Sequence, residues 1–181
     1  MNTLSRRGVT ALLLSFMIGA GLTHAQAQAA TTSGTALGPV DSYFVTQTSL
    51  GTPFQVDAGR LAETKSGIAA VRAYAKLMVS SHITVNNALE AILRRKGALP
   101  PPTLLKAAYA TMIWNLYHET GPRFDAEYVT GQVDYQNANA ALYQYEIANG
   151  SDPDLKASAK TDLPKIQDPL EPALNLHSEA N

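Results

Sequence analysis

The chain has 181 residues, of which 45% are hydrophobic and 16% charged, and its 14 basic and 15 acidic residues leave a formal net charge of -1. This length fits one globular domain with or without an appendage, and the near-neutral charge argues against nucleic acid as the main partner. A mean hydropathy of -0.10 excludes a protein with many membrane spans. The absence of cysteine excludes disulfides, thiolate metal sites, a cysteine nucleophile and the lipid-bearing cysteine of a lipoprotein, so four histidines remain for imidazole chemistry.

Residues 1–29 have the features of a secretory signal peptide. Arginines at 6–7 form a positive start, an uncharged apolar run spans 9–22, and small residues alternate with glutamine just before residue 30. The apolar run is about 14 residues long, short of the roughly 20 that a membrane-spanning helix needs. We therefore expect cleavage before Gln28 or Ala30 and a periplasmic protein, soluble or loosely associated with the envelope. The general secretory route is the default, and twin-arginine export is the alternative.

The mature chain is predicted to begin with a flexible tail and two consecutive helices. Residues 30–38 are small and polar and cannot bury enough surface to order themselves. A short helix is expected from residue 39 to residue 50, where Gly51 ends it. A second segment starts with Pro53 at its first helical position and ends at Ser66.

A long helix is predicted over residues 68–96. Its apolar side chains recur in steps of four and three, and the stripe is continuous only if His82 is counted in it. The basic run at 94–96 closes the helix, because cations complement the negative end of the helix dipole. An anionic ligand at the same run is the alternative. Gly97 and three prolines at 100–102 then form a stiff connector.

Three further helices are predicted beyond this connector. The third is capped by Thr103 and ends near Gly121, and the fourth extends from Pro122 to Asn149. The fourth carries a stripe that we expect in the core, formed by Phe124, Tyr128, Gly131, Tyr135, Ala138, Leu142 and Tyr145. The last helix starts at residues 152–153 and is expected to be kinked or frayed by prolines 164, 169 and 172.

No segment shows the sustained alternation of a β-strand, so the pattern predicts an all-α protein. Two long helices on short connectors favour an antiparallel four-helix bundle with an extra short N-terminal helix and a proline-kinked C-terminal helix. We place the bundle domain at residues 39–176 and a disordered tail at 177–181.

Six short motifs in the mature chain occur in the order and spacing of a bacterial family. They are Asp41-x-x-Phe44, Leu61-Ala62, Val71-x-x-x-Ala75-x-x-Met78-Val79-x-x-His82, Phe124-Asp125-x-x-Tyr128-Val129, Asp152-Pro153-x-Leu155-Lys156 and Leu163-Pro164. Over residues 40–176 the chain resembles the exported, ferritin-like domain of unknown function four-one-four-two, whose members often carry an outer-membrane label. The resemblance implies a ferritin-like four-helix bundle in the periplasm, and it implies no established activity.

The same resemblance implies where a metal site would lie. Family members place an acidic residue at the position of Gln55, Asp-His at Ser81-His82, Asp-His at Asp134-Tyr135, and His at Pro169; of these histidines only His82 is retained here. We therefore expect Gln55, His82 and Tyr135 to form a buried polar cluster in place of a metal site. His82 and Tyr135 lie near the midpoints of their helices and are predicted to form a hydrogen bond, directly or through a water molecule. The alternative is that His82 bonds only to a backbone carbonyl or to Gln55.

The histidine spacing leads independently to the same expectation. A ferritin-like di-iron site needs a Glu-x-x-His pair on each of two helices. The residues three before His82, His118 and His177 are Val79, Asn115 and Leu174. The chain also lacks a Gly-x-Ser-x-Gly elbow and a glycine-rich phosphate loop.

The sequence thus predicts an exported helical bundle with a degenerate metal site and a structural, interaction or envelope-stress role. We expect no catalytic residue, no metal ligand set and no cofactor. The partner is expected to be an envelope protein or a small molecule and not nucleic acid, and no transmembrane segment should remain after signal cleavage. The alternatives are a ferritin-like metal-binding or redox protein, which metal content would reveal, and a small-molecule carrier, which an apolar cavity would reveal.

Overall fold

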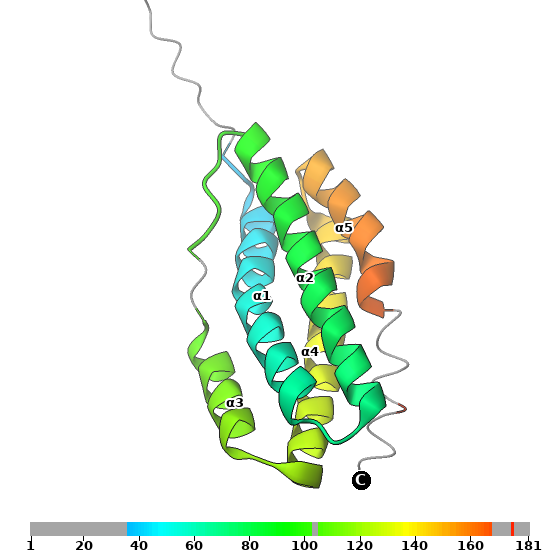
Figure 1. The fold of residues 1–181 in the computed structure, drawn as a ribbon. Helices are drawn as coiled ribbons and strands as arrows, with labels where there is room; N and C mark the ends of the chain where they lie inside the picture. Colours follow the sequence, from blue (N-terminus) through cyan, green and yellow to red (C-terminus); the bar gives the residue numbers. More distant parts are fainter. Residues whose placement is uncertain (1–35, 103–104, 168–174, 176–181) are drawn as a thin grey trace, which may run out of the picture. The chain divides into compact units, whose positions relative to one another are not determined.

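The computed structural model describes residues 36–102, 105–167 and Asn175. The expected signal peptide, most of the expected N-terminal tail, Thr103, Pro169 and the expected C-terminal tail lie outside the described residues. Within them the chain forms five helices and no strand (Figure 1), so the predicted all-α class is confirmed. The helices are α1 Pro39–Lys65, α2 Ala69–Arg95, α3 Ala107–His118, α4 Gly121–Asn149 and α5 Pro153–Gln167.

Four of the helices form the bundle. α1 packs against α2 and α4, and α5 packs against the same two helices, so that each adjacent pair is antiparallel (Figure 1). α2 and α4 therefore lie diagonally across the bundle and run in the same direction, which requires the chain to cross back along the bundle between them. α3 belongs to this crossover and packs on the outside, against α1 and α4. One long crossover is typical of ferritin-like bundles.

The first helix differs from the prediction, because α1 is one continuous helix of 27 residues with Pro53 inside it. Gly51 does not end the helix. It is buried, and a Cβ atom at this position would collide with the hydroxyl group of Tyr135 on α4. The predicted extra short N-terminal helix is therefore wrong. The glycine permits close helix packing, and burial of α1 on both sides of Pro53 outweighs the one backbone hydrogen bond that a proline removes.

Later boundaries also differ from the sequence prediction. The bundle has three long helices, α1, α2 and α4, instead of the two predicted. The short helix outside the four-helix bundle is α3 and not an N-terminal helix. α3 begins only at Ala107, after Lys106, whose side chain makes no capping hydrogen bond. α5 agrees with the prediction in its start at Pro153, it contains Pro164, and Pro169 and Pro172 lie outside the described residues. No helix in the described part of the chain is long and apolar enough to cross a membrane.

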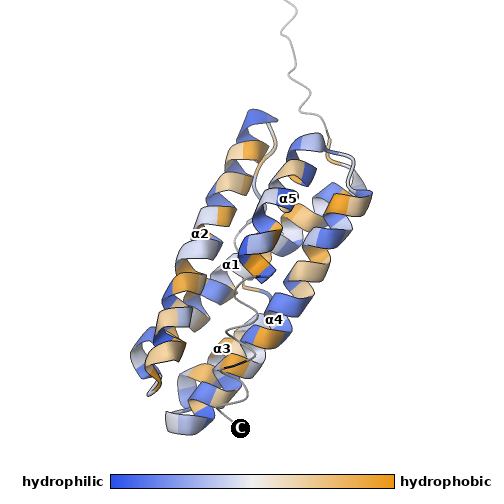
Figure 2. Ribbon diagram, turned by 90° about the vertical axis from the view of Figure 1, so that its right-hand side faces the viewer, coloured by the Kyte–Doolittle hydropathy of each residue, from blue (hydrophilic) through white to orange (hydrophobic). Residues whose placement is uncertain are grey.

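The buried stripe of α4 drifts away from the predicted one along the helix. Phe124, Tyr128 and Tyr135 are buried as predicted, but beyond them Tyr143 is buried and Tyr145 is 51% exposed. The predicted stripe had a period of 3.5 residues, whereas an α-helix has 3.6, so the buried face rotates by about 20° in every seven residues. Figure 2 shows hydrophilic and hydrophobic residues interspersed along each helix.

The apolar core consists of two clusters at different heights in the bundle. One cluster is built around Phe54, Val71, Tyr74, Phe124 and Tyr128. The other is built around Phe44, Leu89, Leu93, Tyr143 and Leu155. The two clusters are separated along α1, α2 and α4 by buried polar residues.

Candidate functional site

A layer of buried polar side chains crosses the middle of the bundle. This polar layer consists of Thr48, Ser49, Thr52 and Gln55 on α1, His82 and Asn86 on α2, and Gln132, Gln136 and Asn139 on α4. Its members lie between the two apolar clusters or at their borders. In ferritin-like bundles, inward side chains of facing helices at such positions hold metal ions.

The structure brings two of the three predicted cluster residues into contact. The rings of His82 and Tyr135 meet edge to face across the bundle, with ring centroids 5.5 Å apart, and each residue is 8% exposed. Within the described residues no direct hydrogen bond joins them, so the direct contact is between the two aromatic rings. A hydrogen bond through water stays a prediction. Gln55 is fully buried, and both polar atoms of its amide lack a hydrogen-bond partner among the described residues.

The position of Tyr135 is fixed by aromatic packing. Its ring centroid lies 5.4 Å from that of Phe54 and 6.0 Å from that of Tyr109, and its hydroxyl group faces Gly51. A tyrosine therefore fills this position by packing, which is a different role from ligating a metal. Burial raises its pKa well above the usual value, so the hydroxyl group stays protonated.

His82 is neutral in this environment. Burial lowers its pKa to about 4, because the apolar surroundings penalise the charged imidazolium. The gap beside its ring has a volume of about 10 Å³, which leaves room for a single water molecule at most.

The polar layer does not fit the metal site that the fold suggests. Its donors are amides, hydroxyl groups and one imidazole. Within the described residues, no three histidine, cysteine, aspartate or glutamate side chains come together in a group that could hold a metal ion. Iron sites of this type need carboxylates, which neutralise the charge of the ions.

Sequence reasoning missed most of this layer. Gln136 donates a hydrogen bond to the Met78 sulfur at 3.1 Å, and Asn86 donates one to Glu90 at 2.8 Å. The remaining carbonyl oxygens of both amides have no partner in the described part of the chain. The buried face of α4 includes Gln132, Gln136 and Asn139, which the predicted apolar stripe left out because they are polar.

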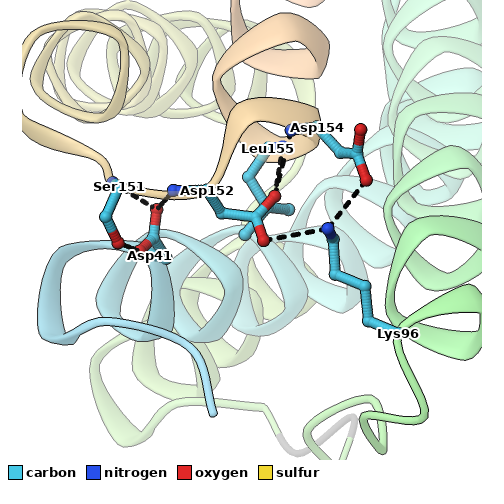
Figure 3. A network of polar contacts seen from close by, with 6 residues as sticks. All are labelled: Asp41, Lys96, Ser151, Asp152, Asp154 and Leu155. Carbon is cyan, nitrogen blue, oxygen red and sulfur yellow. Dashed lines mark hydrogen bonds and ion pairs between the residues drawn. The ribbon is translucent and has the colours of Figure 1, made fainter. Parts of the chain in front are cut away.

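A second polar cluster closes the end of the bundle where α1 begins (Figure 3). Asp41 is fully buried and accepts hydrogen bonds from the backbone N–H groups of Ser151, at 3.0 Å, and Asp152, at 2.9 Å. It also accepts one from the Ser151 hydroxyl group at 2.5 Å. Lys96 forms ion pairs with Asp152 at 2.9 Å and Asp154 at 2.7 Å. These contacts join the start of α1, the residue after α2 and the turn between α4 and α5.

Glu146 on α4 is the buried neighbour of Asp41. It is 0% exposed, and neither of its carboxyl oxygens has a donor partner within the described residues. Burial and the adjacent Asp41 raise the pKa of Glu146 to about 7. Burial also acts to raise the pKa of Asp41, but the hydrogen bonds from Ser151 and Asp152 outweigh it and hold that pKa below its usual value. Below about pH 7, Glu146 therefore holds a proton that it can donate to the ionised Asp41.

The third candidate is a groove on the outer face of the bundle. It has a volume of about 410 Å³ and lies between α1, α3 and α4. Tyr43 and Gln47 contribute from α1 and Tyr109 from α3, while Tyr135 and Asn139 contribute from α4. The groove therefore reaches the polar layer at Asn139, which belongs to the layer, and at Tyr135, which contacts His82 of the layer.

Comparisons with known proteins agree with the fold and give no activity. Residues 24–176 match the family model described as domain of unknown function (DUF4142). The chain is also similar to the crystal structure of a DUF305 fragment from Deinococcus radiodurans, with a TM-score of 0.68 and 13% sequence identity, over 79% of this chain and 98% of that one. At this identity the likeness shows the fold alone. No curated protein matches the chain.

Proposed function

The chain belongs to the DUF4142 family of domains of unknown function, and we propose that it is an exported periplasmic bundle that acts by binding and carries a degenerate metal site. Its role is structural or interactive in the envelope, including under envelope stress, and it needs no catalytic residue of its own. The proposal concerns the mature chain after removal of residues 1–29.

The chemistry of the polar layer carries this proposal. Gln55 and Tyr135 stand where the family resemblance implies an acidic residue and a histidine, and His82 is the one imidazole in the polar layer. A buried neutral histidine beside amides can stabilise a bundle through packing, but it cannot neutralise a divalent ion. The ferritin-like metal-binding or redox alternative would need ligands that these positions do not supply.

Export is supported by the first 29 residues. The positive start, the apolar run of about 14 residues and the small residues before Gln28 and Ala30 are the three parts of a cleavable signal peptide.

The proposal is tested by expressing the full chain in a bacterial host, separating periplasm from membranes and cytoplasm, and analysing the purified protein. We expect a periplasmic protein whose new N-terminus is Gln28 or Ala30, with substoichiometric iron, manganese and zinc after dialysis against a chelator. An intact Met1 in the membrane fraction would contradict export. One tightly held metal ion per chain would contradict the degenerate site.

A further inference from the structure

We infer that the groove between α1, α3 and α4 is a binding site for a planar aromatic molecule with a single negative charge, such as an aromatic carboxylate. The inference names a site and a ligand class for the binding role proposed above, and it rests on that role.

The size and the walls of the groove suit a flat ring. Its volume of about 410 Å³ falls within the roughly 300–1,000 Å³ of typical small-molecule sites. Tyrosine rings from all three helices line it, namely Tyr43, Tyr109 and Tyr135. Tyr109 is held in place because it stacks on Phe54, with ring centroids 4.8 Å apart and an interplanar angle of 19°. Aromatic walls with fixed orientations favour another ring that can stack or approach edge to face.

The side-chain amide of Asn139 offers a hydrogen-bond donor to the groove. Asn139 is 7% exposed and lines the groove, and its side chain makes no hydrogen bond within the described residues. A ligand oxygen in the groove can therefore accept a hydrogen bond from this amide.

The positive charge of Lys106 at the groove favours a ligand with a negative charge. Lys106 lines the groove, and its ammonium group lies 3.3 Å from the Gln47 amide oxygen and 5.9 Å from the centroid of the Tyr109 ring. Among the described residues no carboxylate forms an ion pair with Lys106, so its charge is available to a ligand. The carboxylate of a ligand stacked on Tyr109 would lie within reach of this ammonium group.

Asp134 limits the ligand to one negative charge. It is exposed and lines the groove from α4, whereas Lys106 precedes α3. A second anionic group on the ligand would approach Asp134 and be repelled, because like charges in a partly desolvated groove raise the free energy of binding.

The probe for this site is 2-naphthoate, titrated into the mature protein by isothermal calorimetry. Two comparison probes separate the contributions: 2-naphthalenemethanol keeps the ring and lacks the charge, and decanoate keeps the charge and lacks the ring. We expect one naphthoate per chain, bound more tightly than either comparison probe.

Two pairs of variants localise the binding. Lys106→Gln should weaken naphthoate binding about tenfold, because one charge-assisted hydrogen bond is lost. The same variant should leave the affinity for 2-naphthalenemethanol unchanged. The control Lys160→Gln, on the exposed face of α5, should change the affinity for neither probe. Ala138→Trp fills the groove from an exposed position and should abolish binding. Ala141→Trp, at an exposed position on the same helix, should not.

Three outcomes would overturn the inference: no naphthoate binding, equal binding of all three probes, or binding that survives Ala138→Trp. Each of these leaves the proposed export and metal-free binding role intact. Failure of that role is recorded separately, by cell fractionation and metal analysis.

Discussion

Glu146 and Asp41 are both fully buried at one end of the bundle, and the protonated carboxyl group of Glu146 is positioned to donate to the ionised carboxylate of Asp41. At the centre of the bundle, buried His82 has the opposite property, because it is held neutral. The folded protein therefore favours a proton on one residue and disfavours it on the other.

These two residues make opposite contributions to the pH dependence of stability. The pKa of Glu146 rises from 4.5 to about 7, so its contribution is full below pH 4.5 and is lost as the pH rises through 7. The pKa of His82 falls from 6.5 to about 4, so its contribution is full above pH 6.5 and is lost as the pH falls through 4. Between pH 4.5 and 6.5 the two slopes oppose each other, and the free energy of unfolding of the native chain should change little.

Replacing Glu146 should expose the contribution of His82. Glutamine at this position can still donate a hydrogen bond to Asp41 and does not titrate. For Glu146→Gln we expect the free energy of unfolding to fall by about 3 kcal/mol as the pH drops from 6.5 to 4, and to equal or exceed that of the native chain above pH 7. Urea unfolding at a series of pH values measures this pH dependence, and Asp57→Asn, at an exposed position, serves as the control. A Glu146→Gln profile parallel to that of the native chain would show that Glu146 does not hold the proton.

Replacing His82 should expose the contribution of Glu146. In His82→Phe the edge-to-face contact with Tyr135 is kept and the titrating imidazole is removed. The free energy of unfolding should now fall by about 3 kcal/mol as the pH rises from 4.5 to 7. The same urea series measures this slope. A variant that instead gains stability over this range would mean that His82 is not the residue that opposes Glu146.

Gly51 and Tyr135 should be coupled in stability. Alanine is normally favoured over glycine inside a helix by about 0.5–1 kcal/mol, but at residue 51 the new methyl group would collide with the Tyr135 hydroxyl group. We expect Gly51→Ala to destabilise the native chain and to be tolerated much better when Tyr135→Phe is already present. A double-mutant cycle of urea unfolding measures the coupling. Additive effects would place the two residues apart in solution.

Asp41 should contribute strongly to stability, because it is a fully buried carboxylate. Its three hydrogen bonds to Ser151 and Asp152 are made by an ionised acceptor, so Asp41→Ala should cost about 3 kcal/mol or more. Ser42→Ala, at the next and exposed position, should stay within about 0.5 kcal/mol of the native chain. Comparable losses for both variants would indicate general sensitivity of the helix start.

The sequence predicts those features of the fold that depend on the local spacing of apolar residues. The long helices α2 and α4 and the inward position of His82 follow from apolar spacing, because that spacing determines which face a helix buries. The continuity of α1 could not be predicted, because Gly51 and Pro53 are read locally as helix ends and only the proximity of Tyr135 explains the glycine. Glu146 is buried beside Asp41 of another helix, and no local pattern encodes that contact.

We propose that the polar layer does not hold a metal because Gln55 and Tyr135 do not supply the carboxylate and imidazole ligands that a site beside His82 would need. The most direct test measures the thermal unfolding midpoint of the mature protein with and without added iron(II), manganese or zinc, beside a Gln55→Glu/Tyr135→His variant that restores a carboxylate and an imidazole next to His82. Binding to the folded state alone raises the midpoint. We predict no metal-dependent rise for the native chain and a rise for the variant; a rise in the native chain as large as that in the variant would contradict the account.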